Sequence, residues 1–176
     1  ECGIESIWAV EHVVIPHGYQ SQYPYHESGK IPGGEDPDIP DPMLWLAHAA
    51  ALTTHIRLAT GILIVPQRNP LVLAKECATL AKLSDNRFEL GIGVGWLEEE
   101  FNALGVPWPR RGRRTDEYCE AMQALWSQEP AEYHGEFVDF SNAISRPQPD
   151  GGTVPIVVGG HSDAAARRAG RYGTGF

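Results

Sequence analysis

The sequence predicts an α/β fold built on a parallel sheet. Four short segments are almost continuously apolar, as is typical of parallel strands covered on both faces, and they lie at 6–15, 56–65, 87–96 and 155–160. Segments with apolar residues at helical spacing separate them. This alternation implies right-handed crossovers, either in an open doubly wound sheet or in an eight-stranded (β/α)8 barrel. A complete barrel takes about 250 residues, so four strands would form an incomplete one.

The helices are expected in a fixed order between these strands. Asp or Asn precedes proline at 41–42 and at 69–70, and an N-cap residue followed by proline at the first helical position predicts that helices begin there. A third helix is expected from about 115 to 127, and a fourth begins at Ser162. Residues 133–149 indicate a small hairpin with Gly135 near its turn.

Residues 16–41 interrupt this alternation. They contain five prolines, four glycines and five acidic residues, and a connection of this length is either a functional lid or a mobile surface loop. The chain begins without Met and stops at "RYGTGF", where a new strand would begin. We therefore expect an internal piece of a longer protein that forms a single domain over 1–176.

Composition narrows the classes of function. The formal net charge is −9, from 14 basic and 23 acidic residues, which argues against a nucleic-acid-binding surface and favours a small-molecule ligand. The apolar stretches are shorter than the roughly 20 residues that a membrane helix needs. Cys2, Cys77 and Cys119 show no paired metal spacing and leave one thiol over if two form a bridge. We expect a cytoplasmic protein with no membrane partner.

Candidate binding residues lie where the predicted strands end, because parallel α/β folds bind ligands at the carboxyl ends of their strands. Glycine there allows a flat or phosphorylated ligand to approach the backbone. Ser162 would either help the first turn of the last helix to bind a phosphate or simply cap that helix. The four strand ends carry Glu11 and His12; Gly61 and Ile62; Gly93, Val94, Gly95 and Trp96; and Gly159, Gly160, His161 and Ser162.

Two of these residues raise specific chemical questions. Gly61 interrupts the apolar stretch "ATGILIV", and glycine inside a strand marks either a bulge or a close approach of a ligand. His12 is either a general acid or base or a structural hydrogen-bonding group. A metal site made of Glu11, His12, His17 and His26 is a further alternative, but the spacings match no ligand pattern and we expect no metal.

Four arginines occur within residues 110–114. Such a run can bind nucleic acid, but this chain is acidic overall. We therefore expect these arginines to pair with the glutamates at 98–100.

Several stretches together resemble the luciferase-like flavin and deazaflavin oxidoreductases. They are "SIWAVEHVV", "IRLATGILIVPQRNPLVLAKECATLAKLSDNRFELGIGVGWLEEEFNALGV", "RRGRRTDEY" and "PIVVGGHSDAAARRAGRYGTGF". The portion from "VPQRNPLVLAKE" to "GVGWLEEEFNALGV" is particularly similar to the branch that uses coenzyme F420. The resemblance implies a (β/α)8 TIM-barrel type fold, of which this chain would hold about strands 2 to 5.

The resemblance also implies roles for the residues at the strand ends. The Gly61–Ile62 peptide bond would be cis and would lie behind the central ring of the flavin. His12 matches the histidine that acts as an acid or base beside the reacting carbon in sugar-oxidising relatives. The residues near the cofactor or its phosphate-bearing tail would be Glu11, Gly61, Ile62, Val94, Gly95, Gly159, Gly160 and Ser162.

The resemblance leaves three functions open. The first is hydride transfer between F420 and a small organic substrate, with Arg68 and the 110–114 arginines as candidates to hold the acidic tail of F420. The second is an FMN-dependent monooxygenase that uses oxygen, and the third is an inactive partial barrel that acts as a binding or assembly module. Trp96 stands where we expect a glutamate in sugar-oxidising relatives, so sugar phosphate oxidation is not expected. Exposed sheet edges favour a homo-oligomer, a dimer.

Overall fold

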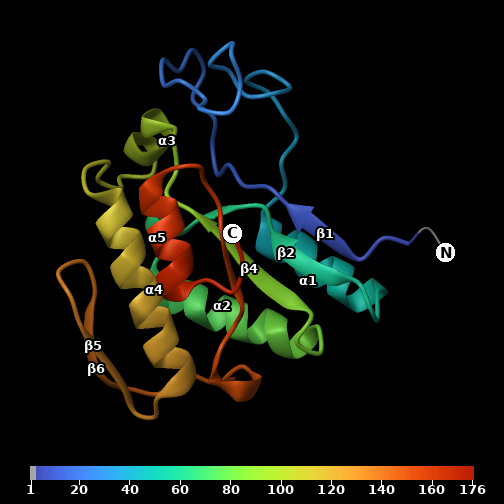
Figure 1. Cartoon of the computed structure of the whole chain (residues 1–176), viewed down its shortest axis with the longest axis vertical. Helices are drawn as coiled ribbons and strands as arrows, with labels where there is room; N and C mark the ends of the chain where they lie inside the picture. The colour runs from blue at the N-terminus through green and yellow to red at the C-terminus, as the bar shows by residue number, and fades with distance from the viewer. Residues whose placement is uncertain (1–2) are drawn as a thin grey trace.

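The computed structural model describes residues 3–176, so Cys2 lies outside the described residues. Strands and helices alternate along most of the chain, with helices packed along the sheet (Figure 1). The elements are β1 (Ser6–Ala9), α1 (Pro42–Leu52), β2 (Arg57–Thr60), β3 (Leu63–Ile64), α2 (Pro70–Leu83), β4 (Phe88–Gly93), α3 (Glu98–Ala103), α4 (Arg111–Ser127), β5 (Ala131–His134), β6 (Asp139–Ala143), β7 (Ile156–Val158) and α5 (Asp163–Tyr172).

The main sheet is parallel throughout, as the sequence predicts. β1 pairs with β2, and β4 pairs first with β2 and then with β3. β7 pairs with the other edge of β4. The spatial order is therefore β1, then β2 with β3, then β4, then β7, and the carboxyl ends of all these strands lie at one edge of the sheet. The predicted α/β fold with a partial parallel sheet is confirmed.

The predicted strand 56–65 is divided in two at Gly61. The Gly61–Ile62 peptide bond is cis, as the resemblance implied. The Gly61 N–H donates to the carbonyl of Ala9 at 2.7 Å, so β1 and β2 stay paired up to the interruption. β3 resumes at Leu63, paired with Ile92. Gly61 was expected to mark either a bulge or the close approach of a ligand, and the backbone shows an irregularity within the strand.

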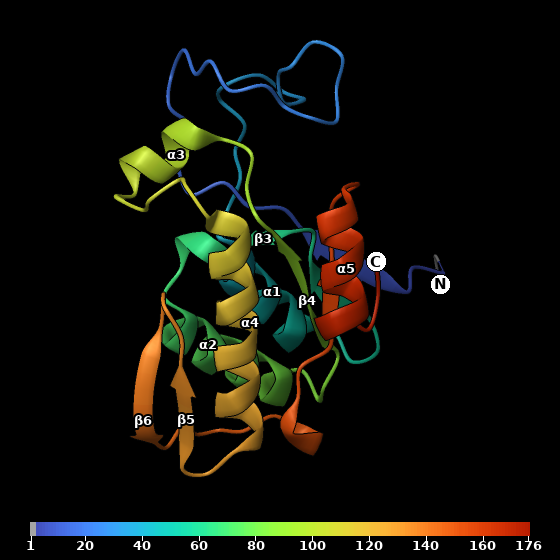
Figure 2. The same ribbon diagram turned by 60° about the vertical axis from the view of Figure 1, so that its left-hand side comes forward.

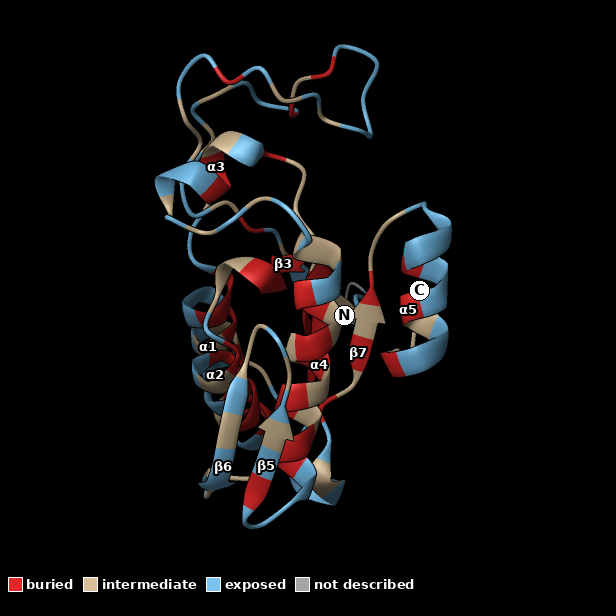
Figure 3. Ribbon diagram, turned by 90° about the vertical axis from the view of Figure 1, so that its left-hand side faces the viewer, coloured by how far each residue is buried: buried red, intermediate tan, exposed pale blue. Residues whose placement is uncertain are grey.

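The core lies between the sheet and helices α1, α2 and α4. Leu46, Leu73 and Met122 face it from these helices, and Leu58 and Leu90 face it from the strands, all fully buried. Figure 3 shows the buried inner faces of α4 and β7 in red. Burial of large apolar side chains on both sides of the interface is the dominant stabilising contribution in a fold of this kind.

Both predicted proline-initiated helices begin as expected. The side chain of Asp41 accepts hydrogen bonds from the N–H groups of Met43 and Leu44 at 2.9 and 3.0 Å. The side chain of Asn69 similarly accepts the first free N–H groups of α2. Each cap therefore satisfies donors that have no partner within the helix.

Several predicted boundaries are wrong. The strands at 6–15 and 87–96 are shorter than predicted and end at Ala9 and Gly93, because the chain turns there to form the edge of a cavity. α4 begins at Arg111 and not near 115, since the guanidinium of Arg114 donates to the carbonyl of Pro107 and so satisfies a polar group beside the first turn. α3 was not predicted at all. The hairpin is formed by β5 and β6, with Gly135 at its turn as expected.

The 10–41 segment contains no helix or strand within the described residues. Figure 2 shows it above the same end of the sheet as α3. Residues of this segment and of the strand ends line one cavity, so the segment covers the carboxyl ends of the strands.

Within residues 3–176, no helix is long and apolar enough to cross a membrane.

Candidate functional site

A cavity of about 760 Å³ lies between the carboxyl ends of the strands and the 10–41 segment. This volume is within the usual range for small-molecule and cofactor sites. The candidate residues at the strand ends line the cavity, except His161 and Ser162. Those that line it are Glu11, His12, Gly61, Ile62, Gly93, Val94, Gly95, Trp96, Gly159 and Gly160.

The glycines at the ends of β4 and β7 make room for Ile62. A Cβ atom on Gly93 would lie 2.0 Å from Cδ1 of Ile62, and one on Gly159 would lie 2.9 Å from its Cγ2. The Ile62 side chain therefore lies between two glycines, and a larger residue at either position would require that side chain to move. We expected these glycines to open the backbone to a ligand directly, but the closest group that they accommodate is the Ile62 side chain, which itself lines the cavity.

Two further glycines form sharp turns at the cavity. Gly95 has φ +81° and Gly160 has φ +124°, conformations that L side chains rarely adopt. A Cβ atom on Gly95 would also lie 2.6 Å from the ring of Phe101. At these two positions the backbone itself forms part of the cavity wall.

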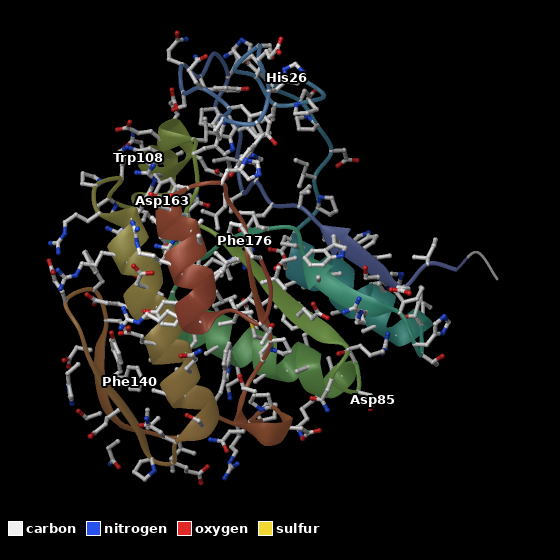
Figure 4. The ribbon with its side chains drawn as sticks, viewed as in Figure 1. His26, Asp85, Trp108, Phe140, Asp163 and Phe176 are labelled. Carbon is white, nitrogen blue, oxygen red and sulfur yellow. The ribbon has the colours of Figure 1, made fainter. Side chains whose placement is uncertain are left out.

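Ser162 caps α5 and does not line the cavity. Its Oγ accepts a hydrogen bond from the N–H of Ala165 at 3.2 Å. Asp163 follows in the first turn of the helix (Figure 4). The simple cap is therefore the interpretation that the geometry supports for the Ser162 hydroxyl, and its contact with a phosphate stays a prediction.

The carboxylate of Glu11 is fully engaged within the protein. Its Oε2 accepts from the N–H of Ile64 at 2.5 Å, and its Oε1 accepts from Nε of Arg68 at 2.9 Å. Burial raises the pKa of Glu11, while the Arg68 charge opposes that rise. Arg68 also binds Asp41 at 2.8 Å. Arg68 is therefore an internal partner of two carboxylates, and the expectation that it holds the tail of F420 has no support in this geometry.

His12 pairs with a buried glutamate that the sequence did not single out. Its Nδ1 lies 3.1 Å from Oε2 of Glu100, whose side chain is 0% exposed. The other carboxylate oxygen of Glu100 accepts the N–H groups of Val13 and Val14 at 2.7 and 3.3 Å. Glu100 thus fixes both the His12 ring and the backbone that follows it.

The predicted pairing between the arginines and the 98–100 glutamates is wrong. Arg110 binds Glu136 of the β5–β6 hairpin, with Nη2 and Oε2 2.6 Å apart, and Arg113 lies 3.4 Å from Glu117. Arg111 donates to the carbonyl of Gly95 at 3.1 Å. The hairpin and α4 itself supply these carboxylates, whereas the side chains of Glu99 and Glu100 bind the 10–41 segment.

Glu99 fastens the 10–41 segment to α3 in a way that depends on pH. The Ser21 hydroxyl donates to it at 2.6 Å and the N–H of Gln20 at 2.7 Å. The Ser21 hydrogen bond above all lowers the pKa of Glu99 from 4.5 to about 2. Because the pKa is lowered in the folded state, these bonds stabilise it above about pH 4.5, and that stabilisation is lost as the pH falls towards 2.

We therefore expect the backbone amide signals of Gln20 and Ser21 to titrate with a midpoint near pH 2 in an NMR experiment. Ser21→Ala should move the midpoint towards 4.5, whereas Glu98→Gln, a change at an exposed neighbour, should leave it in place. A wild-type midpoint near 4.5 would show that Glu99 does not hold the segment.

Aromatic side chains connect the 10–41 segment to the end of β4. The Trp96 ring makes edge-to-face contacts with His12, Tyr19 and Tyr23, with centroids 5.7, 5.5 and 5.2 Å apart. Tyr23 and Tyr25 line the cavity. The sequence did not predict a role for these tyrosines, and the signal it offered was the density of aromatic residues within 19–25. The segment supplies cavity walls, as a lid would.

The histidines proposed for a metal site do not converge. His17 pairs with Glu35 at 2.8 Å, and His26 lies in the outer part of the 10–41 segment (Figure 4). Among residues 3–176, no group of three His, Cys, Asp or Glu residues is arranged to hold a metal ion.

Comparison with known proteins identifies relatives along the whole chain. An uncharacterized protein of Mycobacterium tuberculosis is 39% identical over 157 residues, which cover 89% of this chain and 56% of that protein. The F420-dependent glucose-6-phosphate dehydrogenase of Kineococcus radiotolerans is 32% identical over 180 residues, covering 100% of this chain and 48% of that enzyme. The chain thus spans about half the length of the curated relatives that it matches.

One solved structure has the same fold as this chain, and the sequence of this chain matches the model of one protein family. The monooxygenase RslO1 from Streptomyces bottropensis superposes with a TM-score of 0.76 at 31% identity, over 96% of this chain and 46% of that one. The model described as luciferase-like monooxygenase matches residues 1–176. That match over the whole chain makes this chain a member of the luciferase-like monooxygenase family, which includes F420-dependent and FMN-dependent oxidoreductases.

Proposed function

We propose that this chain carries the cofactor and proton-transfer part of an oxidoreductase that moves a hydride between coenzyme F420 and a small organic substrate. The observation that carries the proposal is that His12 lines the same cavity as the Gly61–Ile62 bond and the glycine-rich ends of β4 and β7. A titratable group thus lies beside a surface suited to a flat ring.

The residues around the cavity fit such a cofactor. Ile62 and Val94 provide apolar surface, and the backbone at Gly95 and Gly160 approaches the cavity in conformations that a side chain would prevent. Gly61, Ile62, Val94 and Gly95 would hold the ring; Gly159 and Gly160, with the first turn of α5, would hold the phosphate-bearing tail. When bound, the deazaflavin supplies the hydride chemistry.

The protein contributes orientation, proton transfer and exclusion of water. His12 exchanges a proton with the substrate through Nε2, the ring nitrogen that Glu100 does not occupy. Tyr23, Tyr25 and Trp96 cover the cavity with mainly apolar surface. Arg111 is the one cation among the described lining residues, and it binds Gly95 and stacks on Trp108. These features favour an uncharged substrate over a sugar phosphate.

The engagement of Arg68 with Glu11 and Asp41 favours a second candidate, an FMN-dependent monooxygenase, since FMN has no polyglutamate tail that needs a basic groove. The similarity to RslO1 supports the same alternative.

The homodimer and the cytoplasmic location also stay predictions. Trp8 and Val10, at the outer strand β1, are about half exposed, and a second copy of the chain would cover them.

A titration of the purified chain with F420 and, separately, with FMN tests the proposal. We expect F420 to bind at least about tenfold more tightly than FMN, measured by cofactor fluorescence at moderate salt. Tighter binding of FMN would replace the proposal with the monooxygenase. Binding of neither would leave the partial barrel as a binding or assembly module.

A further inference from the structure

We propose that Glu100 is a positioning residue that keeps the neutral His12 ring protonated on Nδ1, so that Nε2 is left as a proton acceptor facing the cavity. The consequence for turnover rests on the proposed function, but the protonation pattern of the ring does not. Glu100 lies in α3 and His12 follows β1, so the pair connects two elements that are 88 residues apart in sequence.

The contacts of Glu100 determine which partner donates. The side chain is 0% exposed. Two backbone N–H groups, from Val13 and Val14, point at Oε1, and charge-assisted bonds of this kind stabilise an ionised carboxylate. An ionised carboxylate only accepts hydrogen bonds. The 3.1 Å contact between Oε2 and Nδ1 of His12 therefore requires the proton to be on Nδ1.

The second ring nitrogen of His12 is the one available to a ligand. His12 lines the cavity, whereas Glu100 does not. Among residues 3–176, none forms a hydrogen bond to Nε2 of His12. The Trp96 ring meets the imidazole edge-on at 85°, which restricts rotation of the ring. A neutral imidazole with its proton on Nδ1 presents a lone pair on Nε2, so the arrangement prepares His12 to accept a proton.

Glu100→Gln separates this role from structural support. Glutamine has nearly the same shape, and its amide oxygen can still accept the N–H groups of Val13 and Val14. Its NH2 group then faces Nδ1 of His12 and donates to it. A donor at that position requires a lone pair on Nδ1, so the proton moves to Nε2. The structural contacts persist while the tautomer reverses.

The experiment is ¹⁵N NMR of the histidine ring in the 176-residue chain without cofactor, at a pH where the ring is neutral. We expect the Nδ1–H form in the wild type and the Nε2–H form in Glu100→Gln, with melting temperatures within a few degrees of each other. Glu98→Gln, an exposed position on the same helix, should keep the wild-type pattern. His12→Gln assigns the signals by removing them.

Two results would overturn the inference. One is an Nε2–H ring in the wild type, which can be observed even if the variant fails to fold. The other is an unchanged Nδ1–H ring in a folded Glu100→Gln variant.

Where F420 turnover is measurable, Glu100→Gln should lower kcat by about a hundredfold or more and leave F420 affinity unchanged. Absence of F420 binding would refute the proposed function and leave the tautomer result intact.

Discussion

Gly91→Ala lowers the free energy of unfolding by about 3 kcal/mol, the upper part of the range for an overpacked core. A Cβ atom at this position would lie 1.8 Å from the carbonyl oxygen of Thr60. That oxygen belongs to the backbone of β2, so it cannot rotate away as a side chain could. The Thr60 hydroxyl also donates to the Gly91 carbonyl at 2.6 Å, which holds the two strands together. Urea unfolding followed by circular dichroism measures the loss.

Gly170→Ala is the matched control for this prediction. Gly170 lies in α5, and a Cβ atom there would have no neighbour within 4 Å. Alanine in a helix is favoured over glycine by about 0.8–1.0 kcal/mol, so this variant should be as stable as the wild type or slightly more so. If Gly91→Ala were equally well tolerated, the close approach of β2 and β4 would be wrong.

Gly93→Val weakens cofactor binding by about a hundredfold, which corresponds to about 2.7 kcal/mol. The added Cβ atom would lie 2.0 Å from Cδ1 of Ile62. Because Gly159 lies close to the Ile62 side chain on its other side, we expect that side chain to be displaced into the cavity that it lines. The measurement is a fluorescence titration with whichever of F420 and FMN binds the wild type.

A second substitution tests the stated cause. Ile62→Ala in the Gly93→Val background removes the displaced side chain, so it should restore most of the lost affinity. If the double variant binds as weakly as Gly93→Val, the cavity is not shaped by the Ile62 side chain between its glycines. If Gly93→Val alone binds normally, the cofactor does not occupy this part of the cavity.

Local signals in the sequence were enough to predict the starts of α1 and α2 and the parallel sheet. Asp41 and Asn69 cap their helices through N–H groups only two and three residues away, so a short motif contains the whole interaction. The apolar strands are similarly recognisable because burial on both faces leaves a continuous pattern. The break at Gly61 is visible as a glycine in a strand, but the cis geometry of the next bond followed only from the resemblance.

The pairing of charged groups could not be predicted, because it depends on distant parts of the chain. Glu100 meets a histidine 88 residues away, and Glu99 meets Ser21 across 78 residues. Sequence proximity suggested instead that the 98–100 glutamates would pair with the 110–114 arginines. Arg110 and Arg113 instead meet carboxylates of the hairpin and of α4, and the position of the hairpin beside α4 is a property of the tertiary fold.

The measurement that tests the central claim most directly is the mapping of F420-induced changes in backbone amide chemical shifts. The account predicts that the largest changes occur at the strand ends, at Gly61, Ile62, Val94, Gly95, Gly159 and Gly160, with a change in the His12 ring. Saturable changes confined to other surfaces, or no changes at cofactor concentrations well above micromolar, would contradict a deazaflavin site at the carboxyl ends of these strands.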